Sequence, residues 1–347
     1  MTSELDADLV LEGGGVKGIA LAGAVSLLAE RGYRFRRVAG TSAGSLVGCL
    51  VAAGIGGPRL REMMQAVDYT RFRDPPALYG RFGRAGVLAA VLAHKGWCKG
   101  DALRGWVAEC LQEAGVRTFG DLPLNDDDAA PGLLDDPDRR FRFVAMASDL
   151  SQGRLVRLPW EYRERFGTDP AEASVADAVR ASTAIPYYFR PARCPDRLSG
   201  REAWLVDGGL LSNYPIGVFD RGDGREPRWP TFGIRLSGSA TVNDIDGVVS
   251  LSRAMLSTMT GFYDRLQTIQ PPVVARTILV PTNGISATNF SLSRAAAATL
   301  FDNGREAAAH FLDGWDFEAY KARFRGGRVL AGPAGQGQPA SAGQGGR

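Results

Sequence analysis

The first 55 residues alternate apolar runs with glycine-containing turns, in an order that few folds can accommodate. The apolar run at 9–11 ends in three consecutive glycines and precedes a helical pattern of apolar residues at 18–30. A second run, at 35–39, ends in a serine turn at 40–44, which precedes an apolar stretch without helix breakers. Two strands linked by a helix predict a parallel sheet with crossover helices. We therefore expect an α/β fold.

The rest of the chain continues the alternation of short apolar runs and helical patterns. Runs of strand length lie at 141–147, 204–206, 232–236 and 277–280. Helical periodicity marks residues 101–114, 247–267 and 293–312. Residues 125–140 are rich in Asp, Pro and Gly and predict an acidic surface loop. The Gly, Gln and Ala-rich residues 332–347 predict a disordered tail, because they cannot bury enough apolar surface to become ordered.

Composition excludes several classes of protein. The apolar and charged fractions, 45% and 23%, are those of a globular protein, and a net charge of +3 is too small to indicate nucleic-acid binding. The four cysteines form no C-x-x-C motif and no cluster with histidine, so neither a disulfide framework nor a metal site is expected. No transmembrane run and no conventional signal peptide is seen. We expect a cytoplasmic protein or one peripheral to a membrane, with signal-independent export left open.

The serine turn reads Gly40-Thr41-Ser42-Ala43-Gly44, which fits the G-x-S-x-G pattern of a nucleophile elbow. The pattern alone is weak, since about 0.3 matches are expected by chance in a chain of this composition. Its context is stronger, because a strand precedes it, an apolar helix follows, and the glycines permit a sharp turn. An ordinary turn that caps a helix is the alternative.

The glycine turn, Glu12-Gly13-Gly14-Gly15-Val16-Lys17-Gly18, has three possible functions. Its backbone N–H groups could stabilise the oxyanion of an acyl-transfer intermediate. It also fits the G-x-G-x-x-G pattern of dinucleotide sites, but the acidic residue expected after the second strand is missing. A tight turn without chemical importance is the third possibility. We favour the oxyanion hole.

A serine nucleophile needs a base, and the chain has only two histidines, His94 and His310. His310 follows in the order of an α/β-hydrolase triad but lies within a helical pattern, and His94 follows an apolar stretch. A structural role is favoured for both. Asp207, in Asp207-Gly208-Gly209, ends an apolar strand and is the preferred base, although an Asp-Gly surface turn remains the simpler interpretation of this motif alone.

Together, the glycine turn, the serine turn and the Asp-Gly-Gly motif, in this order, resemble the patatin-like phospholipases, a family of lipid acyl hydrolases. The segments 146–150, 181–186 and 211–216 also resemble the family, and Glu12 is a small departure from it. The resemblance implies a three-layer α/β/α fold with a mostly parallel central sheet, over residues 8–312. Residues 313–331 would form a C-terminal extension.

The resemblance also implies a mechanism without a metal or cofactor. Ser42 would be the nucleophile and Asp207 the proton acceptor of a Ser–Asp dyad. The amides of Gly14 and Gly15 would form an oxyanion hole, in a turn that Gly13 and Gly18 shape. The expected substrates are acyl esters of phospholipids or other glycerolipids. Alternatives are a transacylase, a catalytically silent lipid-binding protein and a His310-dependent esterase.

Residues 71–99 interleave basic and apolar side chains, with six basic residues and one acid, Asp74. This pattern suits a segment that contacts the surface of an anionic membrane, as a lid or a docking surface. An amphipathic helix and loop packed on the core would give the same pattern, and we prefer that interpretation. No nucleic-acid partner is expected.

Overall fold

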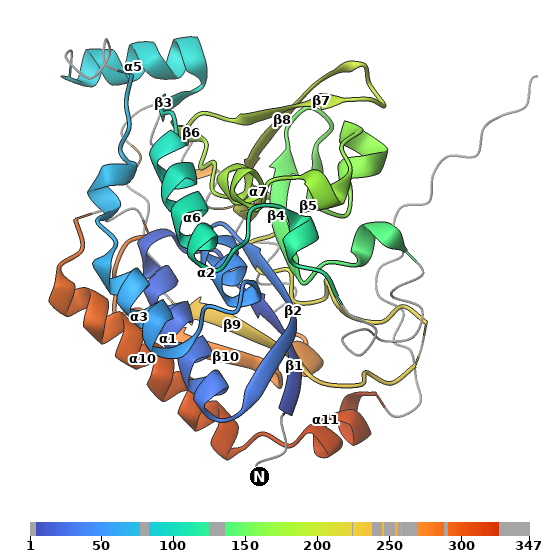
Figure 1. Cartoon of the computed structure of the whole chain (residues 1–347). Coiled ribbons are helices and arrows are strands. Elements are labelled where there is room, and N and C mark those ends of the chain that lie inside the picture. The colour runs from blue at the N-terminus through green and yellow to red at the C-terminus, as the bar shows by residue number, and fades with distance from the viewer. Residues whose placement is uncertain are drawn as a thin grey trace, which may run out of the picture.

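The computed structural model shows helices gathered around a central sheet (Figure 1). It describes residues 5–76, 83–124, 136–223, 225–237, 269–287 and 291–325, together with 245, 254, 255 and 258. The predicted tail, residues 125–135 of the predicted acidic loop and nearly all of the predicted helix 247–267 lie outside the described residues, as do residues 77–82.

The strands of the described part form one eight-stranded sheet and one two-stranded sheet. The large sheet has the order β10-β9-β1-β2-β4-β8-β7, with β5 also paired to β4. Its members are β1 (Leu5–Leu11), β2 (Tyr33–Thr41), β4 (Phe143–Asp149), β5 (Arg154–Leu158), β7 (Ala192–Asp196), β8 (Arg201–Asp207), β9 (Thr231–Ser237) and β10 (Thr277–Pro281). The small sheet pairs β3 (Gly96–Cys98) with β6 (Tyr187–Phe189).

The large sheet is mostly parallel. Strands β10, β9, β1, β2 and β4 run parallel to one another, whereas β5, β7 and β8 join by antiparallel pairs. The predicted α/β class with a mostly parallel central sheet is therefore confirmed. The antiparallel strands come from the middle of the chain and carry one of the two proposed catalytic residues, Asp207.

Helices connect the strands. They are α1 (Gly18–Glu30), α2 (Ala43–Ala52), α3 (Gly57–Ala66), α5 (Gly83–His94), α6 (Asp101–Glu113), α7 (Val175–Ser182), α9 (Pro271–Val274), α10 (Arg294–Asp313) and α11 (Phe317–Phe324). The predictions for 18–30, 101–114 and 293–312 match α1, α6 and α10. Helices α3, α5 and α7 and the π-helical turn Tyr162–Phe166 were not delimited from the sequence.

Alternate residues of β1 pack into two different hydrophobic clusters, one on each face of the sheet. Leu9 and Leu11 belong to the larger cluster, which includes residues of α1, α2, α3, α6, α7 and α10. Val10 belongs to a smaller cluster with Trp160, Tyr214 and residues of irregular segments. This alternation is the two-residue period of a strand buried on both faces.

Helix α10 packs against α1 with almost no space between the backbones (Figure 1). A Cβ atom on Gly23 would lie 1.9 Å from the carbonyl oxygen of Phe301, and one on Gly304 would lie 2.0 Å from that of Ala20. Glycine at both positions therefore lets α10 pack directly against α1, the helix that connects β1 to β2. The sequence places the end of the patatin-like domain at residue 312. Helix α11 follows this boundary, and its Tyr320 is buried.

Candidate active site

Ser42 lies at a sharp turn between β2 and α2. Its φ and ψ are +52° and −121°, a backbone conformation that residues other than glycine rarely adopt. Ser42 is 6% exposed. A Cβ atom on Gly44 would lie 2.3 Å from the carbonyl oxygen of Leu11, and one on Gly40 would lie 2.3 Å from the backbone of Gly44. This strained strand-to-helix turn has the geometry of a nucleophile elbow.

Hydrogen bonds hold both sides of this turn. The Ser42 amide donates to the Ser182 hydroxyl at 3.0 Å, and the Ser42 carbonyl accepts from the Ser45 hydroxyl at 2.6 Å. The Thr41 hydroxyl donates to the carbonyl of Ser212 at 3.0 Å. Ser182 ends α7 and was not predicted as a site residue, although it falls in the segment 181–186 that resembles the family.

Asp207 reaches Ser42 through the register of three neighbouring strands. Thr41 of β2 pairs with Met146 of β4, and the next residue of β4, Ala147, pairs with Asp207 of β8. Asp207 ends strand β8, as the sequence predicted, and β8 runs antiparallel to β4. Asp207 is therefore brought to the level of Ser42 because β8 approaches from the opposite side and stops there.

The Asp207 carboxylate accepts hydrogen bonds from the Ser42 hydroxyl and from the amide of Gly209, the latter at 2.8 Å. The side chain is buried, at 7% exposure. Burial raises the pKa of Asp207 from 3.8 to about 6, although the two hydrogen bonds act in the opposite direction. An aspartate with this pKa is ionised at neutral pH and is a stronger base than an ordinary one.

The glycine turn lies beside Ser42, since a Cβ atom on Gly13 would be 3.3 Å from the Ser42 Cβ. The Gly13 amide donates to the Asn213 carbonyl at 3.0 Å, and the Gly18 amide donates to the Gly15 carbonyl. No acceptor in the described part of the chain takes the amides of Gly14 and Gly15. The oxyanion hole that the resemblance implies at these two amides stays a prediction.

Close packing keeps side chains out of this turn. Gly15 has φ +57°, and a Cβ atom there would lie 2.0 Å from the carbonyl oxygen of Ala287. The Asn213 side chain donates to the Gly13 carbonyl at 3.2 Å, so Asn213 holds Gly13 through both its backbone and its side chain. Glu12, noted as a departure from the family, is buried and accepts from the Leu236 amide, which ties the end of β1 to β9.

Neither histidine lies in this arrangement. His310 is exposed on α10. His94 ends α5 and lines a cavity whose wall includes neither Ser42 nor Asp207. The pKa of His94 is lowered by burial and by the charges of Arg190 and Lys95. These positions support a structural role for both histidines.

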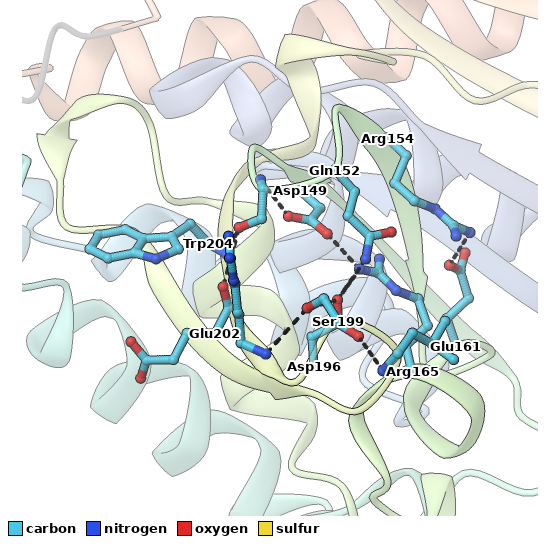
Figure 2. Close-up of polar contacts among 12 residues, drawn as sticks. Asp149, Gln152, Arg154, Glu161, Arg165, Asp196, Ser199, Glu202 and Trp204 are labelled. Carbon is cyan, nitrogen blue, oxygen red and sulfur yellow. Dashed lines mark hydrogen bonds and ion pairs between the residues drawn. The ribbon is translucent and has the colours of Figure 1, made fainter.

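A buried ion-pair cluster stands at the end of β4, the strand that pairs with the Asp207 segment (Figure 2). Arg165 is 1% exposed and contacts Asp149 at 2.6 Å and Asp196 at 3.3 Å. The Gln152 side chain donates to Asp196 at 2.6 Å, and the Ser199 hydroxyl donates to it at 3.1 Å. The cluster joins the ends of β4 and β7 to the π-helical turn. Asp149 lies in the segment 146–150 that resembles the family, but no role was predicted for it.

A family model described as "Patatin-like phospholipase" matches residues 9–220 of the chain. The matched region includes the glycine turn, Ser42 and Asp207. The chain belongs to the patatin-like phospholipase family. This family assignment confirms the resemblance seen in the sequence and supports lipid hydrolysis in general.

Two relatives with which the chain shares about a third of its residues are described as uncharacterised proteins. The chain is 32% identical over 313 residues to the uncharacterised protein YqhO of Bacillus subtilis, covering 89% of this chain and 99% of YqhO. It is 31% identical over 209 residues to an uncharacterised NTE family protein of Mycobacterium tuberculosis. That match covers 60% of this chain and 44% of the mycobacterial protein.

The fold of this patatin-like chain is similar to that of VipD from Legionella pneumophila. The TM-score is 0.50 at 18% sequence identity, and the match covers 88% of this chain and 66% of VipD. At this identity, the similarity supports the patatin fold alone. Within the described residues, no helix combines the length and the apolar character that crossing a membrane requires.

Proposed function

We propose that this protein hydrolyses fatty acyl esters of phospholipids or other glycerolipids. One observation carries the proposal, namely the hydrogen bond from Ser42 on its strained turn to a buried carboxylate with a raised pKa. The glycine turn beside them, with two amides available, supports the same chemistry. Membership of the patatin-like phospholipase family supports the substrate class.

The proposed reaction proceeds in two acyl-transfer steps. Asp207 accepts the Ser42 proton as the serine oxygen bonds to the ester carbonyl carbon, and the Gly14 and Gly15 amides stabilise the oxyanion. The carbonyl re-forms as the bond to the alcohol oxygen breaks, and Asp207 returns its proton to that oxygen. Water then attacks the acyl-enzyme, gives a proton to Asp207, and releases the fatty acid as the proton returns to Ser42.

A transacylase would use the same acyl-enzyme, with another alcohol in place of water. A catalytically silent lipid-binding protein is disfavoured, because the dyad and the glycine turn are both intact. Since the dyad geometry does not distinguish water from other acceptors, hydrolase and transacylase are separated by the products.

Replacing Ser42 with alanine is expected to lower fatty acid release from mixed membrane phospholipids by at least about 10⁴-fold, because the nucleophile is lost. The measurement is quantification of free fatty acid, lysolipid and transacylated product by mass spectrometry, with and without an added alcohol. A Ser293→Ala variant serves as a matched control and should keep its activity, since it removes an exposed hydroxyl at the start of α10 and leaves Ser42 and its partners unchanged. Full activity of the Ser42→Ala protein would exclude the proposed mechanism.

A further inference from the structure

Helix α5 exposes an apolar surface where a helix of a globular protein ordinarily exposes polar residues. Its exposed residues include Ala85, Leu88, Ala89, Leu92 and Ala93. Leu88 is 55% exposed and Leu92 is 73% exposed. The spacing is the i, i+3, i+4, i+7, i+8 pattern by which a helix usually faces a protein core. In this helix that stripe faces solvent.

The buried side of α5 has small residues instead. Gly86 and Ala90 are buried, and residues 85–93 include no charged side chain. The helix lies at the periphery of the molecule, away from the large sheet (Figure 1). A helix that is apolar on all sides is ordinarily buried in a protein or in a membrane. Among the described residues, none covers this apolar surface of α5, which is of the kind that a partner or a membrane ordinarily covers.

A basic cavity of about 500 Å³ lies at the C-terminal end of this helix. Six cationic residues line it, namely Lys95, Lys99, Arg104, Arg180, Arg190 and Arg193. The acidic residues in its wall are Asp101 and Asp177. The excess of four positive charges in this one cavity exceeds the net charge of +3 on the entire chain.

Much of this positive charge is not neutralised by ion pairs. Arg104 pairs with Asp177, and Arg193 pairs with Glu202 at 3.2 Å. Within the described residues, no carboxylate forms an ion pair with Lys95, Lys99 or Arg190. Lys95 instead lies over the ring of Trp204, at 5.5 Å from its centroid. At these three cations an anion can therefore bind without displacing a carboxylate of the described residues.

The Arg180 guanidinium fixes the shape of the cavity. It is 9% exposed and donates through Nη2 to the carbonyls of Lys99 and Arg190, leaving Nη1 without a partner. Gly100 packs against it so closely that a Cβ atom would lie 2.1 Å from Nε. Arg180 therefore holds together the two segments that bring Lys99 and Arg190 to the cavity wall.

We propose that α5 and this basic cavity form a docking site for a bilayer that contains anionic phospholipid. The exposed leucines enter the acyl region, and the cations bind lipid phosphate groups at the surface. Exposed apolar surface beside concentrated positive charge complements an anionic membrane better than it complements a soluble anion, which would leave α5 uncovered. The proposal rests on the proposed function for its choice of a lipid surface.

The docking site is joined to the candidate active site by a short path through the fold. Strand β3, directly after α5, pairs with β6, as Gly96 with Tyr187 and Cys98 with Phe189. Strand β6 directly follows the segment whose Ser182 and Ala184 accept hydrogen bonds from the amides of Ser42 and Asp207. A membrane bound at α5 would therefore contact a helix that is linked, through β3 and β6, to the segment that positions both candidate catalytic residues.

The test is sedimentation of the full-length protein with vesicles of ether-linked phosphatidylcholine, with and without ether-linked phosphatidylserine. Ether lipids have no acyl ester, so binding is measured independently of hydrolysis. We expect binding to the anionic vesicles that weakens with added salt. Replacing Lys95 and Lys99 with glutamate should weaken it at least about 30-fold, from the loss of about 1 kcal/mol per basic residue. Leu88→Ser with Leu92→Ser should weaken it by at least about tenfold.

Matched controls separate this site from general charge and apolar effects. Arg31→Glu with Arg323→Glu changes the net charge equally on exposed residues elsewhere, and Leu198→Ser removes a leucine that is 61% exposed. Both controls should bind as the wild type does, and all variants should hydrolyse a monomeric, water-soluble ester normally. If no ester is hydrolysed, the proposed function fails while the sedimentation result still stands.

Three results would overturn the docking site. The first is equal binding of the wild type to neutral and anionic vesicles. The second is unchanged binding of both docking variants. The third is binding of inorganic phosphate that requires Lys95 and Lys99 in a protein that binds no vesicles, which would make the cavity a site for a soluble anion.

Discussion

An Asp207→Asn protein is expected to lose about 10³- to 10⁴-fold in fatty acid release while it remains folded. Asparagine has nearly the same shape and can still accept the hydrogen bond from the Gly209 amide, but it cannot take the Ser42 proton. The measurement is the initial rate of hydrolysis of a phospholipid and of a water-soluble ester, with circular dichroism as the control for folding. A folded Asp207→Asn protein with wild-type rates would exclude Asp207 as the base.

The same substitution is expected to stabilise the protein at neutral pH. The pKa of Asp207 is raised from 3.8 to about 6 in the folded state, so folding favours the protonated form. Stability from this group is fully present below pH 3.8 and is lost as the pH rises through about 6. A shift of about two units corresponds to about 3 kcal/mol of unfolding free energy, the upper limit of the expected gain for Asp207→Asn.

Urea denaturation of the two proteins at pH 8 and at pH 4 measures this difference. Asp207→Asn should exceed the wild type in unfolding free energy at pH 8, and the difference should shrink near pH 4, where Asp207 is protonated. Equal stability of both proteins at pH 8 would contradict the burial of an ionised carboxylate at this position. A lost activity with a gained stability is the combination expected of a catalytic residue rather than of a structural one.

Arg165→Met is expected to lower the unfolding free energy by about 3–5 kcal/mol, because Asp149 and Asp196 would then be buried without a counterion. Arg165 and both aspartates are at most 2% exposed. Arg163→Met is the matched control, two residues earlier in the same turn. Its side chain is 50% exposed and pairs with Asp138 and Asp169, so its loss should cost less than about 1 kcal/mol.

Urea denaturation at neutral pH measures both arginine variants. Adding Asp149→Asn and Asp196→Asn to Arg165→Met should restore most of the loss, since no unpaired charge is then buried. Similar losses for Arg163→Met and Arg165→Met would contradict the cluster in Figure 2 as a source of stability. Because β4 pairs with the end of β8, loosening this cluster should also reduce the hydrolysis rate at temperatures where the variant stays folded.

The sequence predicted the parallel half of the fold well, because its strands are apolar runs that end at glycine turns. The apolar runs Leu9–Leu11 and 35–39 predict β1 and β2 in this way. The direction of β8 could not be predicted, since an apolar run has no orientation until it is paired. Asp207 was therefore found by its motif, and the register that brings it to Ser42 required the structure.

The residues that support the candidate site were missed for a different reason. Ser182 and Asn213 act through hydrogen bonds to Ser42 and Gly13, which are 140 and 200 positions away in the chain. Nothing in local composition signals such contacts. Periodicity likewise predicted a helix within 71–99 but could not tell whether its apolar stripe faces protein or solvent. Leu88 and Leu92 are exposed, so the structure does not support packing of that stripe on the core.

The central claim is that Ser42 becomes acylated by a lipid ester. The most direct measurement is mass spectrometry of peptides from the protein after brief reaction with phospholipid and acid quenching. We predict a fatty acyl group on the peptide that contains Ser42 in the wild type, and none in the Ser42→Ala and Asp207→Asn proteins. Steady release of fatty acid by a wild-type protein whose Ser42 peptide never carries an acyl group would contradict the account.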